Sequence, residues 1–247
     1  SNPFALRLGG RLTVGLKATD AAPLDRWVAY IHYQSEILRF LEVVALVGAV
    51  PRVLEPRIVV TADDLAEARD VVPEGSKPLV ALHPGATDPR RCWPAEQFAA
   101  VGDALAAEGA RIVVTGTKSE QAIVGAVVDA MHAPAENLCG RLSLGGLTGL
   151  LSRCSVVVSN DTGPQHLAAA VGTATVAIYW CGNLINVGPL TRSRHRPVIS
   201  WRLACPVCGV DCTRVRCEHT ASFVSDVTPE EVIASARDLL ASAPHTQ

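Results

Sequence analysis

From about residue 78 onward, short apolar runs alternate with longer stretches in which apolar residues recur every three or four positions. The short runs predict strands over residues 79–83, 111–115, 137–139, 155–159 and 175–179. The longer stretches predict helices that begin near Pro94, Ser119, Leu144 and Thr162. Strands that alternate with helices in this way predict an α/β fold with a parallel sheet covered by helices.

Helix-capping patterns refine two of these boundaries. Thr228 with Glu231 forms a capping-box pattern and Pro229 suits a first helical position, so residues 229–241 are predicted to form a terminal helix. Thr162 with Gln165 has the same spacing before the Ala-rich stretch that Gly172 ends. Residues 181–227 show no clear periodicity and are predicted to be a long loop, which at that length is usually functional or carries its own cross-link.

The first 55 residues differ from the rest. They offer one helix over residues 36–47 and one convincing strand near residues 12–16, which is too little for a complete α/β domain. We therefore expect residues 1–55 to be the tail of an upstream domain with a connecting helix, and residues 56–247 to be the main domain. Pro51 and Pro56 mark the linker.

Composition narrows the classes of function. The 247 residues are 49% hydrophobic and hold 22 basic against 24 acidic residues, without a dense Lys/Arg block, and aromatic residues make up 4%. The chain can bury a sizeable core, while a broad nucleic-acid surface and base stacking are disfavoured. No apolar run approaches the roughly 20 residues that cross a bilayer, so a soluble protein is expected.

The turn from Asn160 to His166 carries the strongest chemical signal. It follows an apolar run and precedes a helix, so amide groups at the start of that helix and its dipole favour an anion such as phosphate. Gly163 would let a ligand approach the backbone. Asp161 could accept a hydrogen bond from a hydroxyl group, and His166 could donate one to phosphate. The alternative is that Asp161 and Thr162 merely cap the helix and His166 is a core residue.

Two further turns follow predicted strands, where ligands bind in open α/β sheets. Residues 83–91 contain Thr87 and a pair of arginines, Arg90 and Arg91, whose forked guanidinium groups suit phosphate oxygens. Residues 116–120 end in Glu120, which could accept hydrogen bonds from ribose hydroxyls or could simply cap a helix. Three such turns at one edge suggest a nucleoside diphosphate ligand.

Several ordered motifs together resemble glycosyltransferase family 9, the heptosyltransferase-like enzymes. They are His83-Pro-Gly-Ala, Arg91-x-Trp93-Pro94, Gly116 to Glu120, Asn137-Leu-x-Gly140-Arg141-x-Ser143-Leu144 and Ser159-Asn-Asp-Thr-Gly-Pro-x-His166-Leu-Ala-Ala. The resemblance covers about residues 78–190. It implies the C-terminal half of a GT-B glycosyltransferase, a Rossmann-like doubly wound parallel sheet, with a remnant of the N-terminal acceptor half.

The resemblance also implies roles for individual residues. Asp161, Thr162, Gly163 and His166 would hold the diphosphate and sugar of the donor. Arg91 stands where the family usually has Lys and would contact phosphate, Thr87 would add a hydroxyl, and Glu120 would bind the ribose. Ser143 and Leu144 would line the base pocket. The family's catalytic carboxylate lies in the N-terminal half, so no general base is assigned in this chain.

The implied reaction is inverting transfer of a heptose-like sugar from an ADP-linked donor to a hydroxyl of a glycan or lipopolysaccharide-type acceptor. No Asp-x-Asp pair for a divalent cation occurs, so no cofactor is expected for sugar transfer. The resemblance implies a cytoplasmic enzyme, with peripheral membrane association through the missing domain and no nucleic-acid partner. We expect residues 1–247 alone to be inactive.

Two other functions are alternatives to this one. A nucleotide-binding module that has lost transferase activity would keep the same fold, although intact Asp161 and His166 argue against decay. An NAD-dependent oxidoreductase predicts G-x-G-x-x-G after a first strand, and no such motif stands in that position.

Four cysteines fall within one short stretch of the predicted loop. The spacing of Cys205, Cys208, Cys212 and Cys217 permits a structural zinc site, with His219 just after. Disulfides and free thiols are the alternatives. The remaining cysteines stand in apolar surroundings that favour buried structural thiols; they are Cys92, Cys139, Cys154 and Cys181.

Overall fold

The computed structural model describes residues 2–242 and divides into two compact units. The first comprises the residues up to Glu55 together with Asn183–Leu190. The second comprises Pro56–Gly182 and the described residues from Thr191 onward. The second unit contains all the turns in which sequence patterns predict chemistry.

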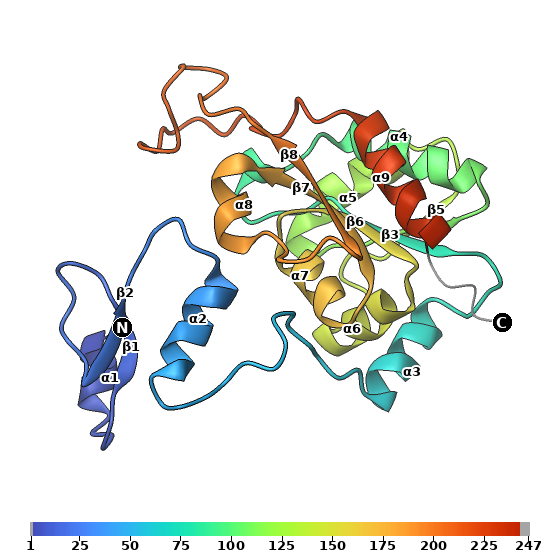
Figure 1. Ribbon diagram of the computed structural model, residues 1–247. Coiled ribbons are helices and arrows are strands. Elements are labelled where there is room, and N and C mark those ends of the chain that lie inside the picture. Colours follow the sequence, from blue (N-terminus) through green and yellow to red (C-terminus); the bar gives the residue numbers. More distant parts are fainter. Residues whose placement is uncertain (1, 243–247) are drawn as a thin grey trace. The chain divides into compact units, whose positions relative to one another are not determined.

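The second unit is built on a six-stranded, wholly parallel sheet (Figure 1). Its strands lie in the order β5-β4-β3-β6-β7-β8. Their bounds are β3 (Leu79–His83), β4 (Arg111–Val114), β5 (Ala135–Asn137), β6 (Val156–Asn160), β7 (Ala174–Trp180) and β8 (His195–Ser200). The chain enters the middle of the sheet with β3 and continues through β4 to β5 at one edge. It then returns to the middle with β6 and continues through β7 to β8 at the other edge. This is the doubly wound arrangement, and the predicted α/β Rossmann-like fold class is confirmed.

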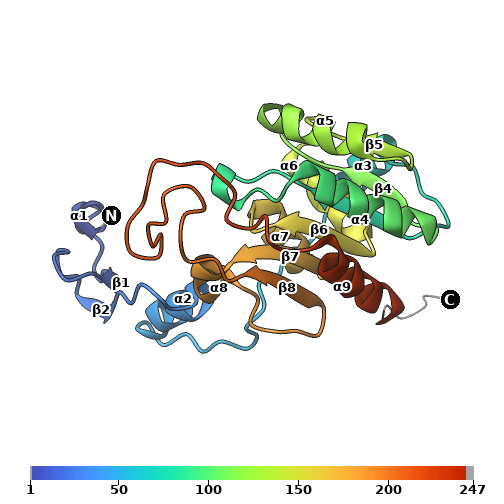
Figure 2. The same ribbon diagram turned by 90° about the horizontal axis from the view of Figure 1, so that it is seen from above.

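Helices cover both faces of the sheet (Figures 1 and 2). One face packs against α4 (Ala95–Ala107), α5 (Gln121–Ala130) and α9 (Pro229–Ser242). The other packs against α3 (Ala62–Val71), α6 (Leu144–Arg153) and α7 (Gly163–Ala170). Alternate residues of each strand supply the two cores: Val80 and Leu82 face the first set of helices, whereas Leu79 and Ala81 face the second. Burial on both faces explains why the central strands β3, β6 and β7 are mostly apolar.

Most predicted elements are confirmed, with boundary shifts of a few residues. The helix predicted from Ser119 begins as a 3-10 turn, η2 (Lys118–Glu120), and the strand predicted over residues 137–139 is β5, two residues earlier. The capping box at Thr228 and Glu231 is formed, as predicted. Helix α3 had no counterpart in the prediction. It lies against α6, where the backbone of Asp64 leaves no room for a side chain at Gly149.

The prediction of one continuous loop over residues 181–227 was wrong. Helix α8 (Cys181–Val187) and strand β8 both lie within it. β8 was missed because it contains Pro197 and the polar His195 and Arg196, which weaken a strand pattern. A proline is tolerated there because β8 is an edge strand that pairs only with β7.

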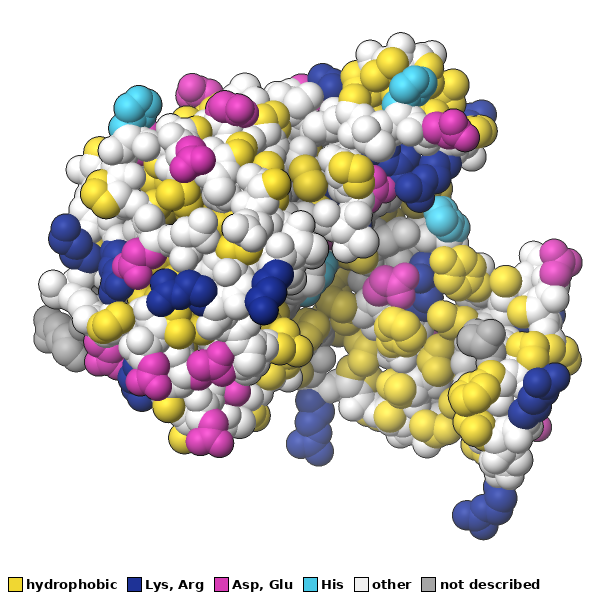
Figure 3. Space-filling view, turned by 180° about the vertical axis from the view of Figure 1, so that it is seen from behind, with side chains coloured by type: hydrophobic (Ala, Val, Ile, Leu, Met, Phe, Trp, Pro, Cys, Tyr) yellow, Lys and Arg dark blue, Asp and Glu magenta, His cyan; other side chains and the backbone are white. Residues whose placement is uncertain are grey.

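The first unit is small. It holds α1 (Asn2–Arg7), a two-stranded parallel sheet of β1 (Val14–Lys17) and β2 (Arg26–Ala29), and α2 (Glu36–Ala45), where a helix was predicted over residues 36–47. Only one of the two strands was predicted. Hydrophobic side chains gather on the surface of this unit (Figure 3), among them Phe4, Leu8, Trp27, Phe40 and Val50.

The guanidinium group of Arg39 provides a polar centre for the first unit. The side chain is buried on α2, forms an ion pair with Glu36, and donates to the carbonyl oxygens of Ile31, His32 and Gln34. It also lies over the ring of Tyr30. The Arg39 side chain therefore holds the backbone before α2 in place by hydrogen bonds, in a unit that buries few apolar residues.

Candidate functional site

The strand order places two of the predicted turns side by side. β3 and β6 are neighbours in the sheet, and connections leave them in opposite directions, so their carboxyl ends form the topological switch point. The turn after β3 carries Thr87 and Arg91, and the turn after β6 carries Asp161 to His166. Ligands of open α/β folds bind at this position.

The side chain of Asn160 links these two turns by hydrogen bonds. Its side-chain Nδ2 donates to the carbonyl oxygen of Pro84 at 2.7 Å, and its Oδ1 accepts from the backbone N–H of Trp93 at 3.0 Å. All these groups are buried, so the amide satisfies two backbone groups that would otherwise lack partners. The sequence prediction included Asn160 in the turn but did not identify this role, because the partners lie far away in sequence.

Arg91, Asp161 and His166 form a cluster of one acidic and two basic side chains at the switch point. Arg91 Nη1 donates to Asp161 Oδ2 at 3.0 Å and to the Asp161 carbonyl oxygen at 3.3 Å. His166 Nε2 lies 3.5 Å from Asp161 Oδ1. The Asp161 side chain is 2% exposed, whereas those of Arg91 and His166 are 27% and 45% exposed. A buried carboxylate thus orients two basic side chains that remain open to solvent.

Helix α7 begins at the predicted place but without the predicted capping box. Thr162 has extended backbone angles typical of an N-cap, yet its side chain makes no capping hydrogen bond. Gln165 is buried, and its Oε1 accepts from the hydroxyl of Tyr179 at 3.1 Å, so it does not turn back to the helix start. The capping box expected for Thr162 and Gln165 was therefore wrong. A β-carbon added at Gly163 would meet nothing within 4 Å, so there is open space beside the helix start.

Glu120 caps η2 and also faces the switch-point turn. Its Oε2 accepts from the backbone N–H and hydroxyl of Thr117 at 2.7 and 2.8 Å. The carboxylate also occupies the space that a side chain at Gly85 would need. Glu120 therefore caps η2, which is one of the two roles that the sequence left open. The same carboxylate also lies against the turn after β3.

His83, at the end of β3, is a buried histidine that the sequence analysis gave no role. Its Nδ1 lies 3.0 Å from the hydroxyl of Thr115 on the neighbouring chain segment. Burial lowers the pKa of His83, while the nearby Glu120 carboxylate opposes that shift. The imidazole is therefore held neutral beneath the turn that carries Arg91.

Ser143 and Leu144 lie at the start of α6. Ser143 Oγ accepts from the backbone N–H of Gly146 at 3.0 Å and donates to Glu67 Oε2 at 2.5 Å. The hydrogen bonds that Glu67 accepts from the hydroxyl and the backbone N–H of Ser143 hold the pKa of Glu67 below its usual value. Leu144 is 76% exposed, and Thr87 is exposed on the turn after β3.

Two surface hollows lie at the opposite, amino-terminal edge of the sheet and contain none of the predicted site residues. Arg111 borders both; one also includes Glu136 and His132, and the other includes Arg153. Their walls lack the turns at strand carboxyl ends where α/β folds bind ligands. We therefore place the candidate site at the switch point.

The predicted cysteine group is only partly brought together. Cys205, Cys208 and Cys217 gather with His219, whereas Cys212 lies outside this group with its Sγ 3.8 Å from that of Cys217. All eight cysteines are free. Backbone N–H groups of Cys208 and Val207 lower the pKa of Cys205 to about 6, against the effect of desolvation.

Comparison with known proteins identifies the family. The sequence model of glycosyltransferase family 9 (heptosyltransferase) matches residues 3–206. The chain belongs to glycosyltransferase family 9. Lipopolysaccharide heptosyltransferase 2 of Salmonella typhimurium is 30% identical over 173 residues, which cover 66% of this chain and 47% of that protein. Lipooligosaccharide heptosyltransferase 2 of Haemophilus ducreyi is 26% identical over 202 residues, 75% of this chain and 56% of that protein.

Solved structures of the family share the fold. A family 9 glycosyltransferase from Veillonella parvula aligns with a TM-score of 0.73 at 22% identity, over 89% of this chain and 64% of that one. E. coli ADP-heptose lipopolysaccharide heptosyltransferase II aligns with a TM-score of 0.63 at 22% identity, over 78% and 56%. The chain spans about half the length of the curated relatives that it matches. Among residues 2–242, no helix has both the length and the apolar character needed to cross a membrane.

Proposed function

We propose that this family 9 chain binds the nucleoside diphosphate sugar donor of a heptosyltransferase, of the ADP-heptose class, at the switch point between β3 and β6. The observation that carries the proposal is the Arg91–Asp161–His166 cluster, in which a buried carboxylate holds two solvent-accessible basic groups at the start of α7. A fold relative, E. coli heptosyltransferase WaaC with ADP, aligns with a TM-score of 0.55, which supports the choice of nucleotide.

The hydrogen-bonding capacity of the cluster suits a diphosphate. Both hydrogen bonds from the Arg91 side chain to Asp161 use Nη1, so Nε and Nη2 of the fork can reach phosphate oxygens. His166 and the first amides of α7 add further donors, and Gly163 leaves space for the ligand to approach. Asp161 would accept a hydrogen bond from a sugar hydroxyl.

The other predicted residues would hold the nucleoside. Thr87 would add a hydroxyl near the phosphates, and Glu120 would accept from the ribose, with Ser143 and Leu144 beside the base. The exposure of Leu144 supports a role in covering an apolar ring, because a free leucine side chain gains from such a contact.

The proposed reaction is inverting transfer of heptose to a hydroxyl of a lipopolysaccharide-type glycan. As the acceptor oxygen bonds to the anomeric carbon, the bond to the diphosphate breaks and negative charge develops on the leaving phosphate. Arg91, His166 and the α7 amides would stabilise that charge, and a single pre-oriented donor typically contributes about 3 kcal/mol. These groups would act without a divalent cation.

We further propose that the first unit is the remnant of the acceptor half and that residues 1–247 alone do not transfer sugar. Its exposed apolar side chains support this assignment, because a complete domain would cover them. The general base that takes the acceptor's proton is then supplied from outside the described residues. The proposed cytoplasmic location follows from the family, and the proposed peripheral membrane contact would be made through the acceptor half.

A titration calorimetry experiment with ADP, UDP and GDP tests the donor site. We expect ADP to bind most tightly, and Asp161→Ala and His166→Ala to weaken it. Arg237→Ala, which removes an exposed arginine paired with Glu108 on the far side of the sheet, is the matched control and should leave binding unchanged. Equal binding of ADP by all four proteins would refute the site. Binding of ADP without transfer by the intact protein would favour the alternative, a nucleotide-binding module without transferase activity.

A further inference from the structure

The segment of residues 201–221, between β8 and the start of α9, has little apolar core of its own. Cys205 is the one buried residue in it. Its large apolar side chains are exposed; they are Trp201, Leu203, Val207, Val210 and Val215. Burial of apolar area therefore contributes little to holding this segment in one conformation, and a cross-link would stabilise it.

The first half of the segment is a tight turn shaped around the sulfur of Cys205. The backbone N–H of Cys205 donates to the carbonyl oxygen of Val210 at 2.8 Å, and that of Gly209 donates to the carbonyl oxygen of Cys205 at 2.9 Å. Gly209 has a φ of +72°, a conformation that favours glycine. The N–H of Val207 points at Cys205 Sγ from 3.4 Å. An amide aimed at sulfur stabilises a thiolate, the form that binds metals.

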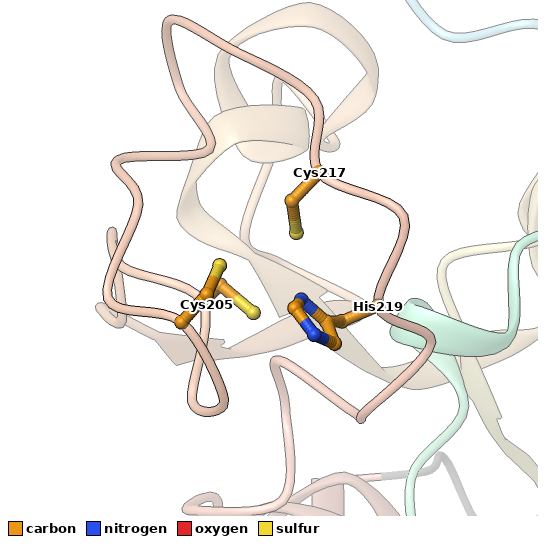
Figure 4. A group of neighbouring side chains, drawn as sticks. Cys205, Cys217 and His219 are labelled. Atoms are coloured by element: carbon orange, nitrogen blue, oxygen red, sulfur yellow. The ribbon is translucent and has the colours of Figure 1, made fainter.

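The second half of the segment returns to this turn and adds two more ligand groups. The sulfur atoms of Cys205, Cys208 and Cys217 and a ring nitrogen of His219 all lie within 4.8 Å of one another. Figure 4 shows Cys205, Cys217 and His219 directed toward a common centre from opposite sides of the loop. Zinc–sulfur bonds of about 2.3 Å in a tetrahedron place sulfur atoms about 3.8 Å apart, so small side-chain adjustments complete the geometry.

We propose that Cys205, Cys208, Cys217 and His219 bind one Zn²⁺ ion in a closed tetrahedral site. Three thiolates and an imidazole are a ligand set typical of structural zinc, and four protein ligands leave no position open for water or substrate. The histidine replaces Cys212 in the set of four cysteines that the sequence alone suggested. The site does not depend on the proposed donor-binding function.

The ion would fix a loop that packs on the turn carrying Arg91. Following the cluster, the hydroxyl of Ser222 donates to the carbonyl oxygen of Cys92 at 2.7 Å. The backbone N–H of Phe223 donates to the carbonyl oxygen of Arg90 at 2.7 Å. Within the loop, Arg216 Nη2 lies 3.9 Å from Asp88 Oδ2. Zinc binding at the loop therefore stabilises the backbone around Arg91 without contacting any ligand there.

Elemental analysis of the chain, purified without added metal, tests the site. We expect close to one zinc per chain, a lower melting temperature after treatment with a chelator, and recovery on addition of Zn²⁺. Cys208→Ser and His219→Ala should lose the metal, whereas Cys212→Ser, the matched control, should keep it. Loss of zinc by Cys212→Ser together with retention by His219→Ala would overturn the ligand set in favour of four thiolates.

Cobalt substitution of the unaltered chain keeps the test independent of how the variants fold. Co²⁺ bound by three thiolates and an imidazole should give intense sulfur-to-metal charge-transfer bands and the visible bands of tetrahedral cobalt. An octahedral spectrum, or a purified chain with no stoichiometric metal and an unchanged melting curve in chelator, would overturn the site. Stoichiometric iron in place of zinc would overturn the choice of metal.

Discussion

Arg91 and Asp161 are 70 residues apart in sequence, yet Nη1 of the arginine donates to Oδ2 of the aspartate at 3.0 Å. The pair is asymmetric, because the carboxylate is 2% exposed and the guanidinium 27%. If Arg91 is removed, the buried carboxylate of Asp161 loses its charged partner. The guanidinium group of Arg91, by contrast, can be solvated by water. This asymmetry leads to the first prediction.

Arg91→Ala should lower the free energy of unfolding by about 2 kcal/mol, because it removes a charge-assisted hydrogen bond to a buried carboxylate. Arg237→Ala, whose partner Glu108 is exposed, should change the free energy by less than about 0.5 kcal/mol. Urea denaturation at pH 7 measures both. Equal effects of the two substitutions would show that the buried position of Asp161 has no energetic consequence.

Arg91→Ala should also weaken ADP binding by at least about tenfold, or about 1.4 kcal/mol, if the free nitrogens of the fork contact phosphate. Arg91→Lys keeps the charge but not the fork, so its affinity should lie between those of the alanine variant and the unaltered chain. Calorimetric titration gives the three dissociation constants. Unchanged affinity in Arg91→Ala would remove this residue from the proposed donor site.

Asn160→Ala should cost about 3 kcal/mol of stability. It leaves the buried N–H of Trp93 and carbonyl oxygen of Pro84 without their partner. Asn137→Ala is the comparison, since its side chain accepts one hydrogen bond from the exposed N–H of Cys139 and should cost less than about 1 kcal/mol. Chemical denaturation of both variants checks the difference, and similar losses would contradict the role given to Asn160.

Gly163→Ala separates ligand binding from folding. A β-carbon there meets nothing within 4 Å and the backbone does not need a positive φ, so stability should be unchanged or slightly higher. If the open space admits the diphosphate, ADP affinity should fall by about tenfold, which is about 1.4 kcal/mol. Thermal melting and calorimetry on the same samples test both parts. A stable variant with full affinity would place the diphosphate elsewhere.

His83 makes stability depend on pH. Burial lowers its pKa in the folded chain, so the unfolded chain binds the proton more readily below pH 6.5. The stabilisation is complete well above that pH and is lost as pH falls, by up to about 1 kcal/mol between pH 6.5 and 5.5. His83→Asn should lose this dependence. Denaturation curves at the two pH values give the slopes, and an unchanged slope in the variant would assign the effect to another group.

The sequence by itself determined the fold class of the second unit. Apolar runs such as Val156 to Val158 predict strands buried on both faces, and Gly172 ends its helix at the predicted place. The motif order was also sufficient to identify the family. These features are local or periodic, so they can be read along the chain without knowledge of distant contacts.

Tertiary structure decided what depends on partners far apart in sequence. Strand β8 forms because it pairs with β7 as an edge strand, a position that tolerates Pro197. The Gln165 side chain does not cap its own helix because it accepts a hydrogen bond from the hydroxyl of Tyr179. The Arg91–Asp161 pair and the approach of His219, in place of Cys212, to Cys205, Cys208 and Cys217 have the same origin. Spacing along a chain restricts which side chains can meet, but the path of the backbone between them selects the ones that do.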